Sequence, residues 1–93
     1  MPEVTVKFFA TVREKAGRKS MEMRVTTIGE LLEKLKSALD PEFEKTVFDP
    51  DTGELRRFFS VMVNGKRIET LDGHDTELEP GDTIAIFPPV GGG

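Results

Sequence analysis

The chain has 93 residues, of which 37% are hydrophobic and 32% are charged, and this composition predicts one soluble globular domain. Its net charge of −4 disfavours nucleic acid phosphates and favours a basic protein partner. Because it has no cysteine, no apolar run of membrane-spanning length and no signal-peptide pattern, we expect a cytoplasmic protein without disulfides, thiolate chemistry or membrane partners.

The first half of the chain begins with two predicted strands. Apolar and polar residues alternate over residues 3–10, which is typical of a half-buried strand. The same alternation over residues 21–25 predicts a second strand that pairs with the first as a hairpin. Residues 11–20 are mostly polar and contain Gly17, so we expect them to turn the chain back.

A helix follows, and its start is marked by a capping box. Thr27 is the expected N-cap, and the Glu30 side chain is expected to reach back to the backbone N–H of Thr27. The Asp40-Pro41 pair predicts the end of the helix. The apolar residues at helical spacing are Ile28, Leu31, Leu32, Leu35 and Leu39.

The second half of the chain predicts three more strands. Residues 41–57 give no clear element, apart from a strong turn signal at residues 49–53. The apolar run at residues 58–63 predicts a strand, and Asn64-Gly65 favours a type I′ turn into a short return strand at residues 66–68. We expect loop or 3₁₀ helix at residues 71–80. Residues 83–87 form the last predicted strand.

The order of these elements predicts an α+β fold of the β-grasp, or ubiquitin-like, type. One main helix packs on one face of a mixed sheet, and the first and last strands, which are the most apolar, lie centrally. Residues 1–87 form the domain, and residues 88–93 form an extended, flexible tail that carries the diglycine. The expected core residues are Val4, Val6, Phe8, Leu31, Leu32, Leu35, Val61, Ile84 and Ile86.

The tail is the main candidate site. Pro88 and Pro89 hold the chain extended, and the following glycines fit a slot too narrow for other residues. A free carboxylate on Gly93 is a group that a partner enzyme can activate and convert. The alternative interpretation is a frayed terminus or a leftover linker, although linker glycines rarely follow a rigid proline pair.

A second candidate is an aromatic surface on the face of the sheet opposite the helix. If Phe8 and Ile86 face the helix, then Phe9 and Phe87 point away from it on adjacent central strands. Grouped exposed aromatic residues typically mark a partner surface. Alternatively, residues 11–20 or the Phe58-Phe59 segment cover these rings.

Other familiar sites are not predicted. His74 is the only histidine, and no second imidazole or cysteine accompanies it as a metal ligand. The Asp49-x-Asp51 pair faintly resembles a calcium loop, but the required oxygen ligand at the fifth position is Gly53, so the segment is interpreted as a turn. We therefore expect no metal and no cofactor bound by this chain.

Two long motifs resemble a known family. The run FFATVRE at residues 8–14 and the run PGDTIAIFPPVGGG at residues 80–93 resemble the opening and the ending of the small subunit of molybdopterin synthase, in the family of MoaD- and ThiS-type sulfur carriers. The run VNG at residues 63–65 matches a weaker signature. Residues 41–57 are longer than in compact members of this family.

The resemblance implies a sulfur carrier. A ubiquitin-activating-like enzyme uses MgATP to adenylate Gly93, a persulfide donor supplies sulfur, and the resulting thiocarboxylate enters the large synthase subunit. There it donates sulfur to cyclic pyranopterin monophosphate in molybdenum or tungsten cofactor biosynthesis. Phe9 and Phe87 would dock the partner, and no side chain of this chain acts as an acid or base. The residues that enter with the tail are Pro88, Pro89, Val90, Gly91 and Gly92.

Three other functions are compatible with parts of the same sequence. A thiamine-pathway sulfur carrier uses the same terminal chemistry but usually lacks the lead-in of Phe87-Pro88-Pro89. A ubiquitin-like modifier would join Gly93 to lysines of target proteins. A non-catalytic β-grasp binding module would not need a free glycine terminus.

Overall fold

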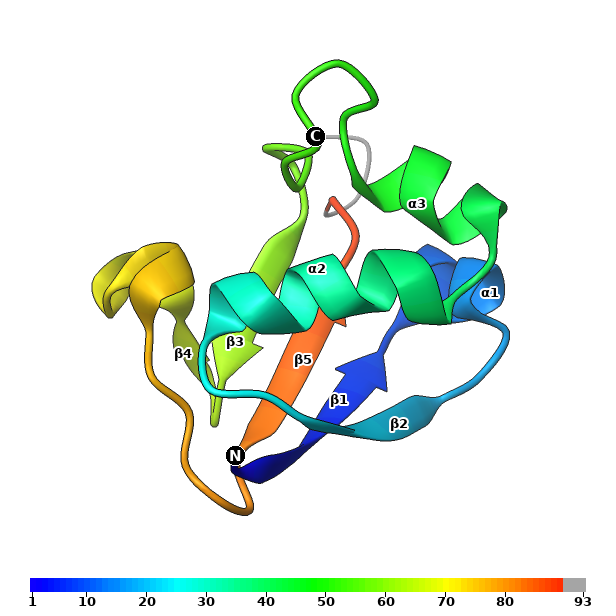
Figure 1. Cartoon of the computed structure of the whole chain (residues 1–93). Coiled ribbons are helices and arrows are strands. Elements are labelled where there is room, and N and C mark those ends of the chain that lie inside the picture. Colours follow the sequence, from blue (N-terminus) through cyan, green and yellow to red (C-terminus); the bar gives the residue numbers. More distant parts are fainter. Residues whose placement is uncertain (90–93) are drawn as a thin grey trace.

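The computed structural model describes residues 1–89, so the predictions for Val90, Gly91, Gly92 and Gly93 lie outside the described residues. These residues contain five strands, three α-helices and two short 3₁₀ helices, which Figure 1 shows joined by loops. The elements in chain order are β1 (Glu3–Phe8), α1 (Ala10–Ala16), β2 (Ser20–Arg24), α2 (Ile28–Ala38), α3 (Pro41–Val47), β3 (Ser60–Val63), β4 (Lys66–Arg67), η1 (Ile68–Thr70), η2 (Gly73–Asp75) and β5 (Thr83–Phe87).

The strands form one mixed sheet in the order β2-β1-β5-β3-β4. β1 and β5 pair in parallel, and the remaining neighbours pair antiparallel. The first and last strands therefore lie inside the sheet, as expected from their apolar sequences. α2 crosses one face of this sheet, which confirms the β-grasp architecture (Figure 1).

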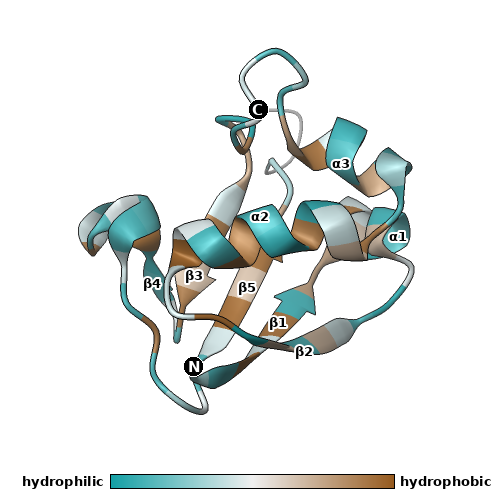
Figure 2. Cartoon of the chain, viewed as in Figure 1, coloured by the Kyte–Doolittle hydropathy of each residue, from teal (hydrophilic) through white to brown (hydrophobic). Residues whose placement is uncertain are grey.

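The core lies between α2 and the sheet. Alternate residues of the strands face α2 and are buried, and all nine core residues expected from the sequence are among them or on α2. Figure 2 shows the hydrophobic bands of β5 beneath α2. Burial of these side chains is the main source of stability in a domain of this size.

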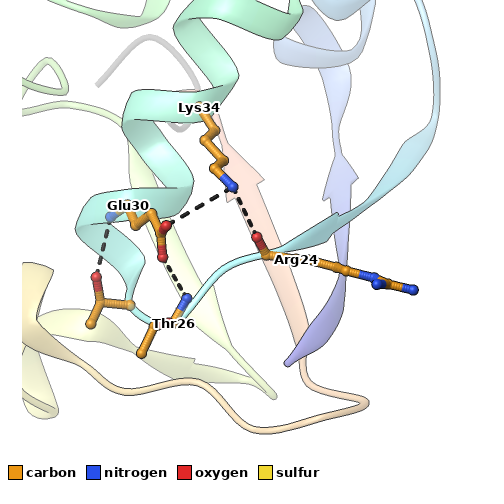
Figure 3. Close-up of polar contacts among 5 residues, drawn as sticks. Arg24, Thr26, Glu30 and Lys34 are labelled. Carbon is orange, nitrogen blue, oxygen red and sulfur yellow. Dashed lines mark hydrogen bonds and ion pairs between the residues drawn. The ribbon is translucent and has the colours of Figure 1, made fainter. Parts of the chain in front are cut away.

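Thr27 is the N-cap of α2, as predicted, but the hydrogen bond accepted by the Glu30 side chain comes from a different residue than expected (Figure 3). Thr27 Oγ1 accepts a hydrogen bond of 3.2 Å from the backbone N–H of Glu30. The Glu30 carboxylate, however, accepts from the backbone N–H of Thr26 at 2.7 Å rather than from that of Thr27. Lys34 extends this network, because its Nζ donates to the backbone carbonyl of Arg24 at 3.1 Å and lies 3.9 Å from the Glu30 carboxylate.

Residues 11–20 turn the chain back as expected, because β1 and β2 pair antiparallel, but most of the segment forms α1 rather than a loop. Only Val12 of this seven-residue helix is buried, so the sequence shows no helical periodicity there. The helix ends at Gly17, whose φ of 75° lies in the left-handed region that favours glycine. α1 packs against α3, and this tertiary contact supports a helix too short to be stable alone.

Residues 41–57, which gave no clear element, contain α3 and a turn. Asp40-Pro41 was expected only to end the preceding helix, yet Pro41 also occupies the first turn of α3, where proline is favoured. Phe43 and Val47 are buried one helical turn apart. The ring of Phe43 packs edge-on against that of Phe8, with centroids 5.9 Å apart, so this segment extends the core.

Both predicted turns are present. The backbone N–H of Gly53 donates to the Asp49 carbonyl at 2.7 Å, which closes the turn at residues 49–53. Asn64 and Gly65 have φ angles of 51° and 86°, as a type I′ turn requires. The following strand is shorter than expected, because Ile68 already belongs to η1.

Candidate docking groove beside the tail

The rings of Phe9 and Phe87 lie together on the face of the sheet opposite α2. Phe9 follows β1 with extended backbone angles (φ −126°, ψ 147°), so its side chain points away from that of the buried Phe8. Phe8 pairs with Ile86 in the parallel register, which brings the next residues, Phe9 and Phe87, side by side. Their centroids are 4.6 Å apart at an interplanar angle of 11°, and the expected aromatic pair is confirmed.

The two rings form one wall of a groove of about 410 Å³. Neither residues 11–20 nor the Phe58-Phe59 segment lines it, and Phe9 and Phe87 are both half-buried, so the rings stay partly open to solvent. The lining residues come from β3, β4, β5, the start of α1 and the segments that follow β1 and β5. They are Phe9, Ala10, Ser60, Met62, Arg67, Phe87, Pro88 and Pro89.

Four lining residues were not singled out from the sequence: Ala10, Ser60, Met62 and Arg67. Ser60 and Met62 alternate with the buried Val61 and Val63, so the alternation that predicted the position of Phe87 applies to them as well. Arg67 lies opposite Met62 across the β3–β4 hairpin. Its position follows once the type I′ turn fixes the hairpin register.

Ala10, within the FFATVRE run, has an unusual backbone conformation. Its φ is 51°, in a region that residues with a Cβ rarely adopt. The chain turns here from β1 into α1, and the backbone N–H groups of Val12 and Arg13 both donate to the Phe9 carbonyl, at 3.0 and 3.3 Å. The Arg13 side chain also donates to the Phe8 carbonyl at 3.3 Å. Together these contacts hold the turn that carries the Phe9 ring.

The tail leaves the sheet at this groove. β5 ends at Phe87, and both Pro88 and Pro89 line the groove, with Pro88 half-buried and Pro89 exposed. Their place beside the aromatic pair agrees with a spacer between the domain and the tail. The roles assigned to Val90, Gly91, Gly92 and Gly93 fall outside the described residues and stay predictions.

The other residues considered from the sequence, His74 and the Asp49–Gly53 turn, do not line the groove. His74 is exposed, and within residues 1–89 no cluster of potential ligands is suited to a metal ion. Asp49 Oδ1 accepts a hydrogen bond of 2.8 Å from the backbone N–H of Asp51, so this carboxylate stabilises a turn. No helix in the described part of the chain is long and apolar enough to cross a membrane.

A second hollow, of about 610 Å³, lies between α2 and the edge strand β2. It is larger than the groove, but it is lined mainly by polar and charged side chains such as Glu22 and Glu33. None of the predicted site residues contributes to it. The aromatic groove is therefore the better candidate, because it combines apolar walls with the residues that begin the tail.

Comparison with known proteins shows the family of this chain. The ThiS family model matches residues 6–93. Small archaeal modifier protein 3 of Haloferax volcanii is 38% identical, and the match covers 98% of this chain and 99% of that protein. The sulfur carrier protein CysO of Mycobacterium tuberculosis is 29% identical over 83% of each chain.

Solved structures show the same fold. The solution structure of small archaeal modifier protein 1 from Methanosarcina acetivorans superposes with a TM-score of 0.89 at 32% identity, covering 100% of this chain and 98% of that one. A Pyrococcus furiosus structure described as a putative molybdopterin converting factor, subunit 1, gives a TM-score of 0.69 at 28% identity, covering 97% and 100% of the two chains.

The fold and the groove define a ubiquitin-like protein with an aromatic surface at the base of its C-terminal segment. The family match covers this surface and the whole tail. The chain belongs to the ThiS family of ubiquitin-like sulfur carriers.

Proposed function

We propose that this chain carries sulfur as a thiocarboxylate on Gly93 and delivers it to the large subunit of molybdopterin synthase. The observation that carries the proposal is the apolar groove of Phe9 and Phe87 at the point where Pro88 and Pro89 lead into the tail. A partner that binds this groove receives the tail in its own active site. The likeness to the Pyrococcus furiosus protein supports the choice of acceptor.

The chemistry requires activation of the terminal carboxylate. A carboxylate is a poor electrophile, and adenylation by MgATP releases pyrophosphate and installs AMP as a leaving group. The terminal sulfur of an enzyme persulfide then attacks the acyl carbon and displaces AMP. A thiol cleaves the resulting S–S bond, which leaves the thiocarboxylate on Gly93 and a disulfide on the donor side. In the synthase, this sulfur passes to cyclic pyranopterin monophosphate.

This chain contributes binding and access rather than acid–base catalysis. The aromatic groove docks the partner, and the prolines restrict the conformations of the segment that must enter it. Gly91 and Gly92 lack side chains, so the acyl carbon of Gly93 reaches a closed pocket. MgATP, the persulfide and the reacting acids and bases belong to the partners.

A second candidate function is protein modification. The high similarity to small archaeal modifier protein 3 over nearly the full length of both chains supports it. In that case the activated Gly93 would acylate lysine side chains of target proteins. Activation by adenylation is common to both functions, so the two differ only in the acceptor.

Intact mass spectrometry tests the carrier function directly. The purified protein is incubated with its activating enzyme, MgATP and a persulfide donor, and we expect a mass gain equal to one exchange of oxygen for sulfur. The mass before reaction also tests whether Gly93 is the last residue of the mature chain. Deletion of Gly93, or extension beyond it, should abolish the gain while leaving the thermal midpoint nearly unchanged.

The acceptor is tested in a second step. Addition of the large synthase subunit and cyclic pyranopterin monophosphate should return the carrier to its carboxylate mass and yield molybdopterin. Glycine remnants on lysines of cellular proteins would instead support the modifier function. A wild-type mass that stays unchanged with a competent activating enzyme, MgATP and a persulfide donor contradicts the carrier function.

A further inference from the structure

Two cations flank the apolar centre of the open face of the sheet. The pairing register places Lys7 beside Ala85, Ala85 beside Met62 and Met62 beside Arg67, in one row across β1, β5, β3 and β4. The adjacent row contains the stacked rings of Phe9 and Phe87. Lys7 and Arg67 are exposed. Arg67 lies on the edge strand β4, and beyond Lys7 the row ends with Ser20 of β2.

These two cations have no ion-pair partner within residues 1–89. The nearest acidic position on β2 is Glu22, which pairs with Thr5 in the next row of the sheet. Asp82 is held elsewhere, because its carboxylate accepts from Asn64 Nδ2 at 2.9 Å and from the backbone N–H of Glu79 at 2.8 Å. The rows that contain the groove therefore carry only positive charge.

This local charge is opposite to that of the whole chain. The net charge of −4 led to the expectation of a basic partner. A basic surface against Lys7 and Arg67 would be repelled, and an apolar surface would desolvate both cations without compensation. A partner that packs on Phe87 is favoured when it places carboxylates opposite these two residues.

We propose that the activating enzyme docks on this face with an apolar surface in the groove and with carboxylates against Lys7 and Arg67. The inference rests on the proposed function and names the first partner in it. The activating enzyme is the occupant because sulfur delivery and protein modification both begin with activation of the tail. The groove adjoins Pro88 and Pro89, so any enzyme that takes the tail meets this face.

Charge reversal tests the inference. The variants are Lys7→Glu, Arg67→Glu and their combination, and the matched control is Lys66→Glu. Lys66 is exposed, adjacent to Arg67 and opposite the buried Val63, so it points to the other face of β4. The readout is the release of pyrophosphate by the activating enzyme with MgATP, measured over a range of carrier concentrations at low and high salt.

We expect each reversal on the open face to raise the apparent KM of the carrier by roughly tenfold, with kcat at saturation little changed. The control variant should stay within about twofold of the wild type. The wild-type KM should rise with ionic strength, and that of the double variant should lose this dependence. Equal KM values for all variants, or a lower KM after reversal, would overturn the inference.

Two further measurements distinguish loss of docking from loss of folding and from failure of activation itself. Thermal midpoints check that each variant is folded, and Lys7→Gln with Arg67→Gln provides milder changes if a reversal prevents folding. If the neutral variants also match the Lys66→Glu control, the acidic docking surface is refuted while activation itself stands. If the competent enzyme does not activate the wild type at all, the proposed function fails and this inference falls with it.

Discussion

The ring of Phe9 lies nearly parallel to the ring of Phe87, with centroids 4.6 Å apart and an interplanar angle of 11°. The first residue comes from the segment that follows β1, and the second is the last residue of β5. Their contact joins the start of the domain to the base of the tail. The geometry of the groove therefore depends on the parallel pairing of β1 with β5.

Phe87→Glu should leave the fold intact and weaken binding to the activating enzyme and to the large synthase subunit. The side chain lies on the open face, so its loss removes little from the core. In a complex, the new carboxylate would either lie unpaired against Phe9 or neutralise Arg67. Calorimetric titration measures the affinity, with the exposed Leu71→Glu as control. Unaltered affinity for both partners would exclude this face as the docking surface.

Leu35→Ala should lower the free energy of unfolding by about 2–5 kcal/mol. Leu35 is fully buried between α2 and the sheet, and Leu32→Ala should act similarly because only 3% of that residue is exposed. The exposed Ser37→Ala on the same helix is the control and should stay within about 0.5 kcal/mol of the wild type. Urea denaturation provides the measurement. An unchanged midpoint for either leucine variant is incompatible with the orientation of α2.

Ala10→Val should destabilise the protein by more than about 1 kcal/mol. The φ of Ala10 is 51°, and a β-branched side chain tolerates this region worse than alanine does. Ala10→Gly should stay within about 1 kcal/mol of the wild type, because relief of strain offsets the greater freedom of the unfolded chain. Thermal unfolding tests both, with Ala38→Val on α2 as the control. Equal losses at positions 10 and 38 would disprove the strain.

Asn64→Ala should destabilise the β3–β4 hairpin more than Asn64→Gly does. The Asn64 side chain donates to Asp82 and accepts from the backbone N–H of Thr83, both at 2.9 Å. Either variant loses these bonds, at about 0.5–1.5 kcal/mol each, but only alanine also strains the φ of 51°. Hydrogen exchange of the β3 and β5 amides reports the local effect. Identical exchange in the two variants would show that the turn angle contributes nothing.

The strands and α2 were predictable because each shows a clear period. Alternation along β1 and β5 placed Phe8 and Ile86 in the core, and so placed Phe9 and Phe87 on the other face. The capping box located the start of α2, although the bond from Glu30 goes to Thr26, one residue earlier than expected. Local chemistry specifies these elements strongly, and tertiary packing agrees with it.

The two short helices could not be predicted in the same way. α1 buries only Val12, and one residue defines no period. The Asp40-Pro41 pair is compatible with the end of one helix and with the start of the next, and here it serves as both. The charged flank of the groove depends on register, because Arg67 reaches it only through the pairing of β4 with β3.

The central position of β5 has a consequence for biosynthesis. β5 is the last of the described strands in the chain, yet it lies between β1 and β3. Until residues 83–87 have emerged from the ribosome, β1 and β3 lack the strand that joins them, so the five-stranded sheet cannot be complete. An interrupted chain has neither the aromatic pair nor its groove. An enzyme that reads this groove would therefore pass over unfinished molecules and act on completed ones.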